Sequence, residues 1–139
     1  MSFREKSAWI TFVLLLAFGV YFAEVAKPWF GFSTAHANYF PLFLLLVAAI
    51  VIVEIVLHVI IAIRSPQDAK APRDERERLI GQRATARAYF WLLAGAFAAI
   101  GMIHLGAGPL VLAHGVLFAI WIAELVRHAS LLYYYRHGV

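Results

Sequence analysis

The sequence contains no cysteine and few charged residues, and each of these two features excludes certain kinds of protein or binding site. Without cysteine the chain can form neither disulfides nor thiolate metal sites. Charged residues make up only 14% of the 139 residues, whereas hydrophobic residues make up 63%. This balance is far from that of a soluble domain and indicates a membrane protein.

Four long apolar runs account for the hydrophobic excess. They cover residues 8–26, 41–63, 88–105 and 109–135. A helix needs about 20 such residues to cross the hydrocarbon core, and continuously apolar runs favour helices over the alternating pattern of a β-barrel. We therefore expect an all-α membrane protein, a single integral domain of residues 1–139 that folds as a four-transmembrane-helix bundle. The first run is too long for a signal-peptide core and lacks a small-residue cleavage site, so we expect it to be retained.

Basic residues are distributed unevenly between the connections. Arg4 and Lys6 precede the first run, Arg136 follows the last, and the opposite side has only Lys27. The connection of residues 64–87 carries Arg64, Lys70, Arg73, Arg76, Arg78, Arg83 and Arg87. The positive-inside rule then places both termini and this connection in the cytoplasm, with the protein in the inner (plasma) membrane. Insertion alone explains the basic pI, so we expect no direct nucleic-acid binding.

Two matched pairs of ionisable residues lie within the apolar runs. Glu54 and His58 are four residues apart, as are Glu124 and His128, and the two pairs are 70 positions apart. Ionisable groups at membrane depth are costly and are therefore functional candidates. The matched spacing suggests a 2+2 parallel pseudo-repeat about an axis along the membrane normal. In that arrangement the second and fourth spans face each other, and the four side chains meet in the inner leaflet.

The chemistry of such a cluster leaves several alternatives open. Two carboxylates and two imidazoles suit a divalent metal, although bundle di-metal sites use Glu and His three residues apart rather than four. A bis-histidine haem between His58 and His128 is a second alternative, and a proton relay or polar ligand site is a third. The structural alternative is hydrogen bonding that satisfies buried polar groups and holds helices together. We expect no bound cofactor and cannot assign metal ligands from the sequence.

The connection of residues 64–87 has features of a helix. Pro72 suits a first helical turn, and Asp74, Glu75 and Glu77 follow where the helix dipole favours acidic residues. We expect a cytoplasmic helix from about Arg73 that continues into the third span. It is either a solvated stalk or a docking surface for a cytosolic protein. The expected contact residues are Asp74, Arg76, Arg78, Leu79, Ile80, Arg83 and Arg87.

The charged segment of this connection also resembles a segment of a known protein family. Its sequence is Asp74-Glu75-Arg76-Glu77-Arg78-Leu79-Ile80, with Arg83, Arg87 and Tyr89 beyond it. It resembles a family of small uncharacterised prokaryotic four-span membrane proteins with an Asp-Glu-Arg-x-x-Leu-Ile-type motif before the third span. Such proteins resemble companions of small helix-turn-helix regulators. The resemblance implies a membrane-bound partner that restrains or releases a transcription factor, and it brings no catalytic residues.

Motifs that the sequence lacks also limit the functions that we expect. We find no nucleophile–base pair, phosphate loop or established metal motif, so we do not expect an enzyme. We expect a regulatory membrane protein that binds a cytosolic protein, with a small DNA-binding regulator as the first candidate. The alternative is a small transport or redox protein that uses the Glu/His cluster. Against it, no span is interrupted at its middle by Gly or Pro, the usual sign of a transported-substrate site. A homodimer remains open.

Overall fold

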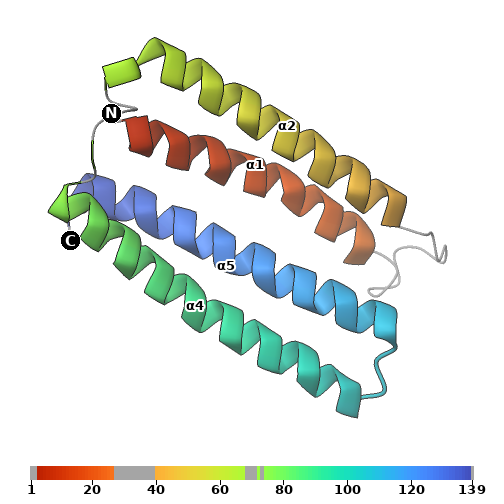
Figure 1. Cartoon of the computed structure of the whole chain (residues 1–139). Helices are drawn as coiled ribbons and strands as arrows, with labels where there is room; N and C mark the ends of the chain where they lie inside the picture. The colour runs from red at the N-terminus through yellow and green to blue at the C-terminus, as the bar shows by residue number, and fades with distance from the viewer. Residues whose placement is uncertain (1–2, 27–39, 68–71, 73, 139) are drawn as a thin grey trace. The chain divides into compact units, whose positions relative to one another are not determined.

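The computed structural model describes residues 3–26, 40–67, 72 and 74–138. Within these residues the chain forms four long helices and no strand (Figure 1). They are α1 (Phe3–Ala26), α2 (Phe40–Arg64), α4 (Glu75–His104) and α5 (Pro109–His137). All four are long and apolar enough to cross a membrane, which confirms the expected all-α class with four spans.

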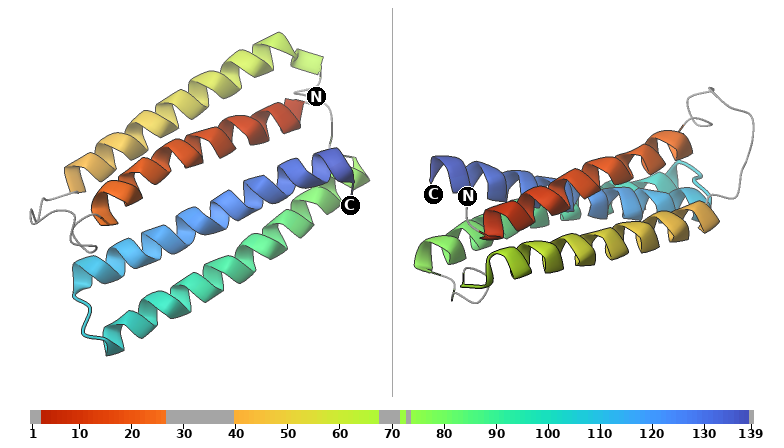
Figure 2. Two further views of the ribbon diagram at one scale, coloured as in Figure 1. Left: turned by 180° about the vertical axis from the view of Figure 1, so that it is seen from behind. Right: turned by 90° about the horizontal axis from the view of Figure 1, so that it is seen from above.

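The helices pair into two compact units, Met1–Lys70 and Ala71–Val139. In the first unit α1 packs against α2, and in the second α4 packs against α5 (Figure 1). Figure 2 shows from two further directions that the helices of each pair run antiparallel. Each unit is therefore a helical hairpin. The division falls between the two halves of the expected pseudo-repeat, while the repeat itself stays a prediction.

The α1–α2 hairpin is held at one end by aromatic rings. Tyr21 is only 1% exposed, and its ring centroid lies 5.5 Å from that of Phe18 and 5.7 Å from that of Phe43. The outer surface of α2 is different. Its most apolar window has a mean hydropathy of 3.1, and no residue of that window is buried. Such a surface suits lipid, because continuous exposure of so many apolar side chains to water is unfavourable.

The α4–α5 hairpin is packed through small residues. Gly95 approaches Ala119 so closely that a Cβ added to the glycine would lie 2.5 Å from the Cβ of Ala119. Gly115 lies against Ala99 in the same way, with a corresponding distance of 3.4 Å. Small residues spaced four apart allow two backbones to approach, as in other membrane helix pairs. At the connecting turn, Gly106 adopts a positive φ of 80°, which glycine tolerates without strain.

Helix α4 begins with a cap and continues without a break into its apolar half. The carboxylate of Asp74 accepts a hydrogen bond of 2.6 Å from the backbone N–H of Glu77. From there the helix runs for 30 residues, which corresponds to a length of about 45 Å. The hydrocarbon core is only about 30 Å thick, so several turns of α4 extend beyond it. The expected helix that runs from about residue 73 into the third span is therefore confirmed.

Candidate functional site

Glu54 and His58 project from α2 toward hydroxyl groups on α1. Thr11 Oγ1 donates a hydrogen bond of 2.7 Å to Glu54 Oε1, and Ser7 Oγ lies 2.6 Å from His58 Nε2. Ser7 and Thr11 are four residues apart on α1, as Glu54 and His58 are on α2. Because the two helices are antiparallel, matched spacings bring both pairs into register. The four side chains form a polar seam within the α1–α2 hairpin.

The hydrogen bonds define the protonation of the imidazole in its neutral form. His58 Nδ1 lies 2.7 Å from the backbone oxygen of Glu54, and a carbonyl oxygen can only accept. Nδ1 therefore carries the hydrogen, and Nε2 accepts from the Ser7 hydroxyl. Each member of the seam has a hydrogen-bond partner within its own hairpin. These bonds offset the cost of placing polar groups at membrane depth.

Glu124 and His128 on α5 have different surroundings. His128 Nδ1 lies 2.9 Å from the backbone oxygen of Glu124, the same local bond as in the first pair. The Glu124 carboxylate, however, lies 3.3 Å from Arg127 Nη1 and 3.5 Å from His128 Nδ1. The imidazole is buried, whereas the side chains of Glu124 and Arg127 are 43% and 42% exposed. This second pair is thus an ion-paired cluster within one helix.

The two Glu/His pairs belong to different hairpins, and their expected contact with each other stays a prediction. Within the described residues of either hairpin, no three His, Asp or Glu side chains gather as they would around a metal ion. The sequence reasoning did not identify Ser7 and Thr11. Their signal was present, because two hydroxyl residues four apart in an apolar run match the spacing of Glu54 and His58.

The first turns of α4 present different residues on different sides. Ile80 is fully buried, as is Ala84 one turn later, and Ala88 continues this stripe toward α5. Leu79 is 48% exposed, and Arg76 and Arg83 beside it are exposed as well. The expected contact surface is therefore revised. Ile80 anchors α4 in its hairpin and does not belong to the exposed surface, whereas Leu79 does.

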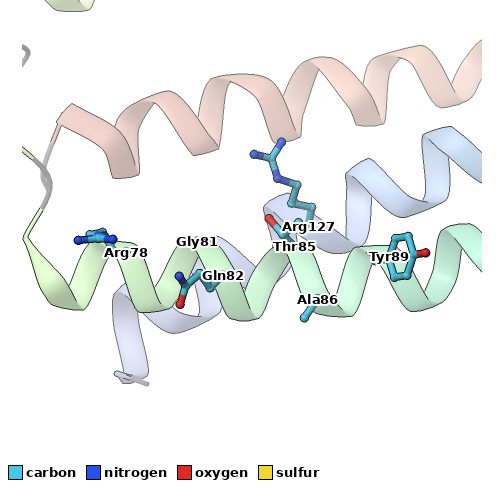
Figure 3. Close-up of a pocket in the computed structure, with 7 residues that line it drawn as sticks. All are labelled: Arg78, Gly81, Gln82, Thr85, Ala86, Tyr89 and Arg127. Carbon is cyan, nitrogen blue, oxygen red and sulfur yellow. The ribbon is translucent and has the colours of Figure 1, made fainter.

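The remaining expected contact residues serve different purposes. Asp74 is the helix cap described above. The guanidinium carbon of Arg87 lies 5.0 Å from the centre of the Tyr134 ring, a cation–π contact between α4 and α5. Arg78 lines a pocket of about 590 Å³ to which α5 contributes Arg127 (Figure 3), and it also lines a smaller pocket together with Leu79.

Comparison with known proteins gives one match. Residues 4–139 match the model of a family described as "Predicted membrane protein (DUF2178)". The chain belongs to this DUF2178 family. No curated protein and no solved structure matches it.

Membership of the DUF2178 family agrees with the four candidate spans, and the protein resides in a lipid bilayer. The description of the DUF2178 family assigns no reaction, ligand or partner. Function is therefore argued from the contacts and exposure of the residues described above.

Proposed function

We propose that this chain is a non-enzymatic regulatory protein of the inner membrane that binds a cytosolic protein through the first turns of α4. The proposed contact surface consists of Arg76, Leu79 and Arg83. The observation that carries the proposal is the exposure of Leu79, whose side chain is 48% accessible between two exposed arginines. We refer to these three residues as the Leu79 surface.

The burial of Ile80 supports this assignment. Ile80 and Ala84 are buried on one side of α4, and α4 packs against α5, so we infer that this side faces α5 and sets the rotation of the helix about its axis. Leu79 then cannot turn inward without displacing the buried stripe. Anionic lipid favours a purely basic face, whereas the Leu79 surface is also bordered by Glu75. An apolar residue among charges of both signs is better suited to a groove on a protein.

The resemblance of the charged segment suggests which protein. The resemblance implies a companion of a small helix-turn-helix regulator, so a small DNA-binding regulator is our candidate partner. Within the motif, Asp74 caps the helix and Ile80 is buried, which gives both residues structural tasks. Leu79 is the apolar motif residue that stays accessible. The Asp-Glu-Arg-x-x-Leu-Ile-type segment would thus combine a helix start with a contact residue.

The proposal requires the basic ends of both hairpins to lie in the cytoplasm. In the α1–α2 hairpin, Arg4 and Lys6 lie at the same end as Arg64, since the helices are antiparallel. In the other hairpin, the start of α4 and Arg136 near the end of α5 share one end. The positive-inside rule assigns such ends to the cytoplasm. Reporter fusions after residue 139 and within residues 65–73 should both report cytoplasm, and a periplasmic signal at either would overturn this orientation.

Replacement of Leu79 tests the proposed contact. Burial of one leucine contributes roughly 1.5–3 kcal/mol, so Leu79→Ser should weaken the partner's affinity about ten-fold or more. Leu79→Met keeps an apolar side chain of similar volume and is the matched control. Both variants should insert and express normally, because the side chain is exposed.

The readout is quantitative affinity purification from the native cell, followed by transcript profiling. We expect a DNA-binding regulator to be recovered with the wild type and with Leu79→Met, and to be depleted with Leu79→Ser. Transcripts in the Leu79→Ser strain should match those of a strain that lacks the protein. Equal recovery with all three forms, and unchanged transcripts, would mean that this part of α4 is a stalk.

The seam of Ser7, Thr11, Glu54 and His58 does not lead us to propose a transport or redox function. Each of its polar groups has a hydrogen-bond partner within the hairpin, and joining α1 to α2 accounts for the arrangement.

A further inference from the structure

A pocket of about 590 Å³ opens along the first turns of α4, and it shares Arg78 and Gln82 with a smaller pocket that Glu75 and Leu79 line. Arg78, Gln82, Thr85 and Tyr89 line it from α4, and Arg127 lines it from α5 (Figure 3). The four α4 residues are spaced four, three and four apart, which places them on one face of the helix. The pocket thus belongs to the α4–α5 hairpin alone.

Small residues also line the pocket. Gly81 is one of them, and a Cβ built on this glycine would meet nothing within 4 Å. Ala86 is a second small lining residue. The polar side chains follow one another along α4, with Arg78 near one end of the row and Arg127 beside Thr85 (Figure 3).

The lining groups favour an anion with several oxygen atoms. Two guanidinium groups, an amide and two hydroxyls can all donate hydrogen bonds. Among the described residues, no carboxylate lines this pocket, and Glu75 lines the adjoining one beside Arg78. Arginine binds phosphate in bidentate fashion, with stronger bonds than neutral donors provide. Glu124 lies 3.3 Å from Arg127 Nη1 through one oxygen, which occupies one of the five N–H donors of that guanidinium. The others remain available to a ligand.

The position of the pocket along α4 indicates the source of the phosphate. Tyr89 is followed by Phe90 and Trp91, where the apolar run of the third span begins. Aromatic residues at such junctions mark the level of the lipid headgroups. Basic pockets between membrane helices at this level bind the headgroups of anionic lipids. We propose that the pocket binds the phosphate group of an anionic phospholipid. A soluble phosphate compound would offer the same chemistry, and the experiment separates the two sources.

The experiment measures lipid retention by native mass spectrometry. The whole protein is purified with equal amounts of phosphatidylcholine and phosphatidylglycerol, and the lipid that stays bound is quantified. We expect the wild type to retain phosphatidylglycerol selectively, and Arg78→Gln and Arg127→Gln each to reduce its retention about ten-fold. Arg83→Gln removes the same charge from the same helix outside the pocket. This control should retain the lipid within about two-fold of the wild type, because the electrostatic attraction between the remaining positive charges and the anionic lipid is largely unchanged.

Gly81→Leu is a second type of variant, which keeps both arginines and fills the pocket. The space above Gly81 is open, so the new side chain has no protein atom to displace. It should therefore fold, as far-ultraviolet circular dichroism can verify, and lose phosphatidylglycerol as the arginine variants do. Retention by Gly81→Leu, or a loss with Arg83→Gln equal to that with Arg127→Gln, would overturn the pocket as the binding site.

Calorimetry with inorganic phosphate tests the soluble source, with protein in phosphatidylcholine nanodiscs. Selective phosphatidylglycerol retention without measurable phosphate binding supports the lipid headgroup. Phosphate binding that the pocket variants abolish, without any lipid selectivity, overturns the lipid and assigns a soluble phosphate compound to the same residues. The absence of both signals overturns the anion site. The pocket is tested by lipid and phosphate binding, whereas the Leu79 surface is tested by recovery of a protein partner, so the failure of one proposal is distinguishable from the failure of the other.

Discussion

The close approach of α4 and α5 leads to a sharp prediction about Gly95. In Gly95→Ala, the added methyl would lie 2.5 Å from the Cβ of Ala119 and 3.1 Å from its Cα. Carbon atoms normally pack at about 3.5–4.0 Å, so the helices must separate by roughly an ångström to accept it. The nearest obstacle is the short side chain and backbone of a helical alanine, which cannot rotate away.

The expected magnitude follows from two opposing effects. Overpacking of this kind costs about 1–3 kcal/mol, whereas replacing glycine by alanine within a helix gains about 0.5–1 kcal/mol. Gly101 in the same helix supplies the matched control, because a Cβ there meets nothing within 4 Å. Gly101→Ala should therefore be neutral or stabilising. The helix-propensity term cancels between the two variants, so Gly95→Ala should be less stable than Gly101→Ala by about 1–3 kcal/mol.

The assay is reversible unfolding of the detergent-solubilised protein by titration with SDS, followed by tryptophan fluorescence. Gly115→Ala adds an intermediate point, since its Cβ would lie 3.4 Å from that of Ala99. We expect the order of stability Gly101→Ala, then Gly115→Ala, then Gly95→Ala. If Gly95→Ala is as stable as Gly101→Ala, then the small-residue packing of this hairpin is not as described.

Three further predictions concern single contacts and use the same unfolding assay. Thr11→Val keeps the volume of the side chain but removes its hydrogen bond to Glu54, and should destabilise the α1–α2 hairpin by about 0.5–1.5 kcal/mol; full stability would mean that the bond does not form. Ile80→Ala should cost about 2–5 kcal/mol, whereas Leu79→Ala should change stability by less than about 0.5 kcal/mol, because only Ile80 is fully buried. Equal effects would contradict the orientation of α4. Gly106→Ala should cost about 1–2 kcal/mol through backbone strain alone, since φ is 80° there and the surrounding space is open; an unchanged stability would show that the turn adopts another conformation.

The number and positions of the helices could be predicted because they depend on local properties of the sequence. Each apolar run is long enough to specify a span without knowledge of its neighbours. The start of α4 was predicted to within about two residues, but Pro72 was wrongly placed in the first turn, because Asp74 is the cap and the helix begins at Glu75. Glu124 and Arg127 are three residues apart on one helix, and their ion pair needs no tertiary information.

The contacts between helices could not be predicted, because they depend on register and rotation. The spacing of Ser7 and Thr11 matches that of Glu54 and His58, but it does not fix the register in which Thr11 meets Glu54, since many registers of two apolar helices bury similar surfaces. Leu79 and Ile80 are equally apolar neighbours, and only the position of α5 decides which is buried. Periodicity gave a partial signal, because Ile80, Ala84 and Ala88 are spaced four apart, but alanine contributes little to a hydrophobic pattern.

The unbroken course of α4 has a mechanical consequence. Its 30 residues contain no proline, so the polar first turns and the apolar second half behave as one rigid rod. Residues 75–87 extend about 20 Å beyond the start of the apolar run. A tilt of roughly 10° at the membrane level would displace the tip of such a lever by about 3–4 Å. A change in bilayer thickness or lateral pressure that tilts the span therefore moves the N-terminal end of α4 by a distance comparable to the width of a side chain.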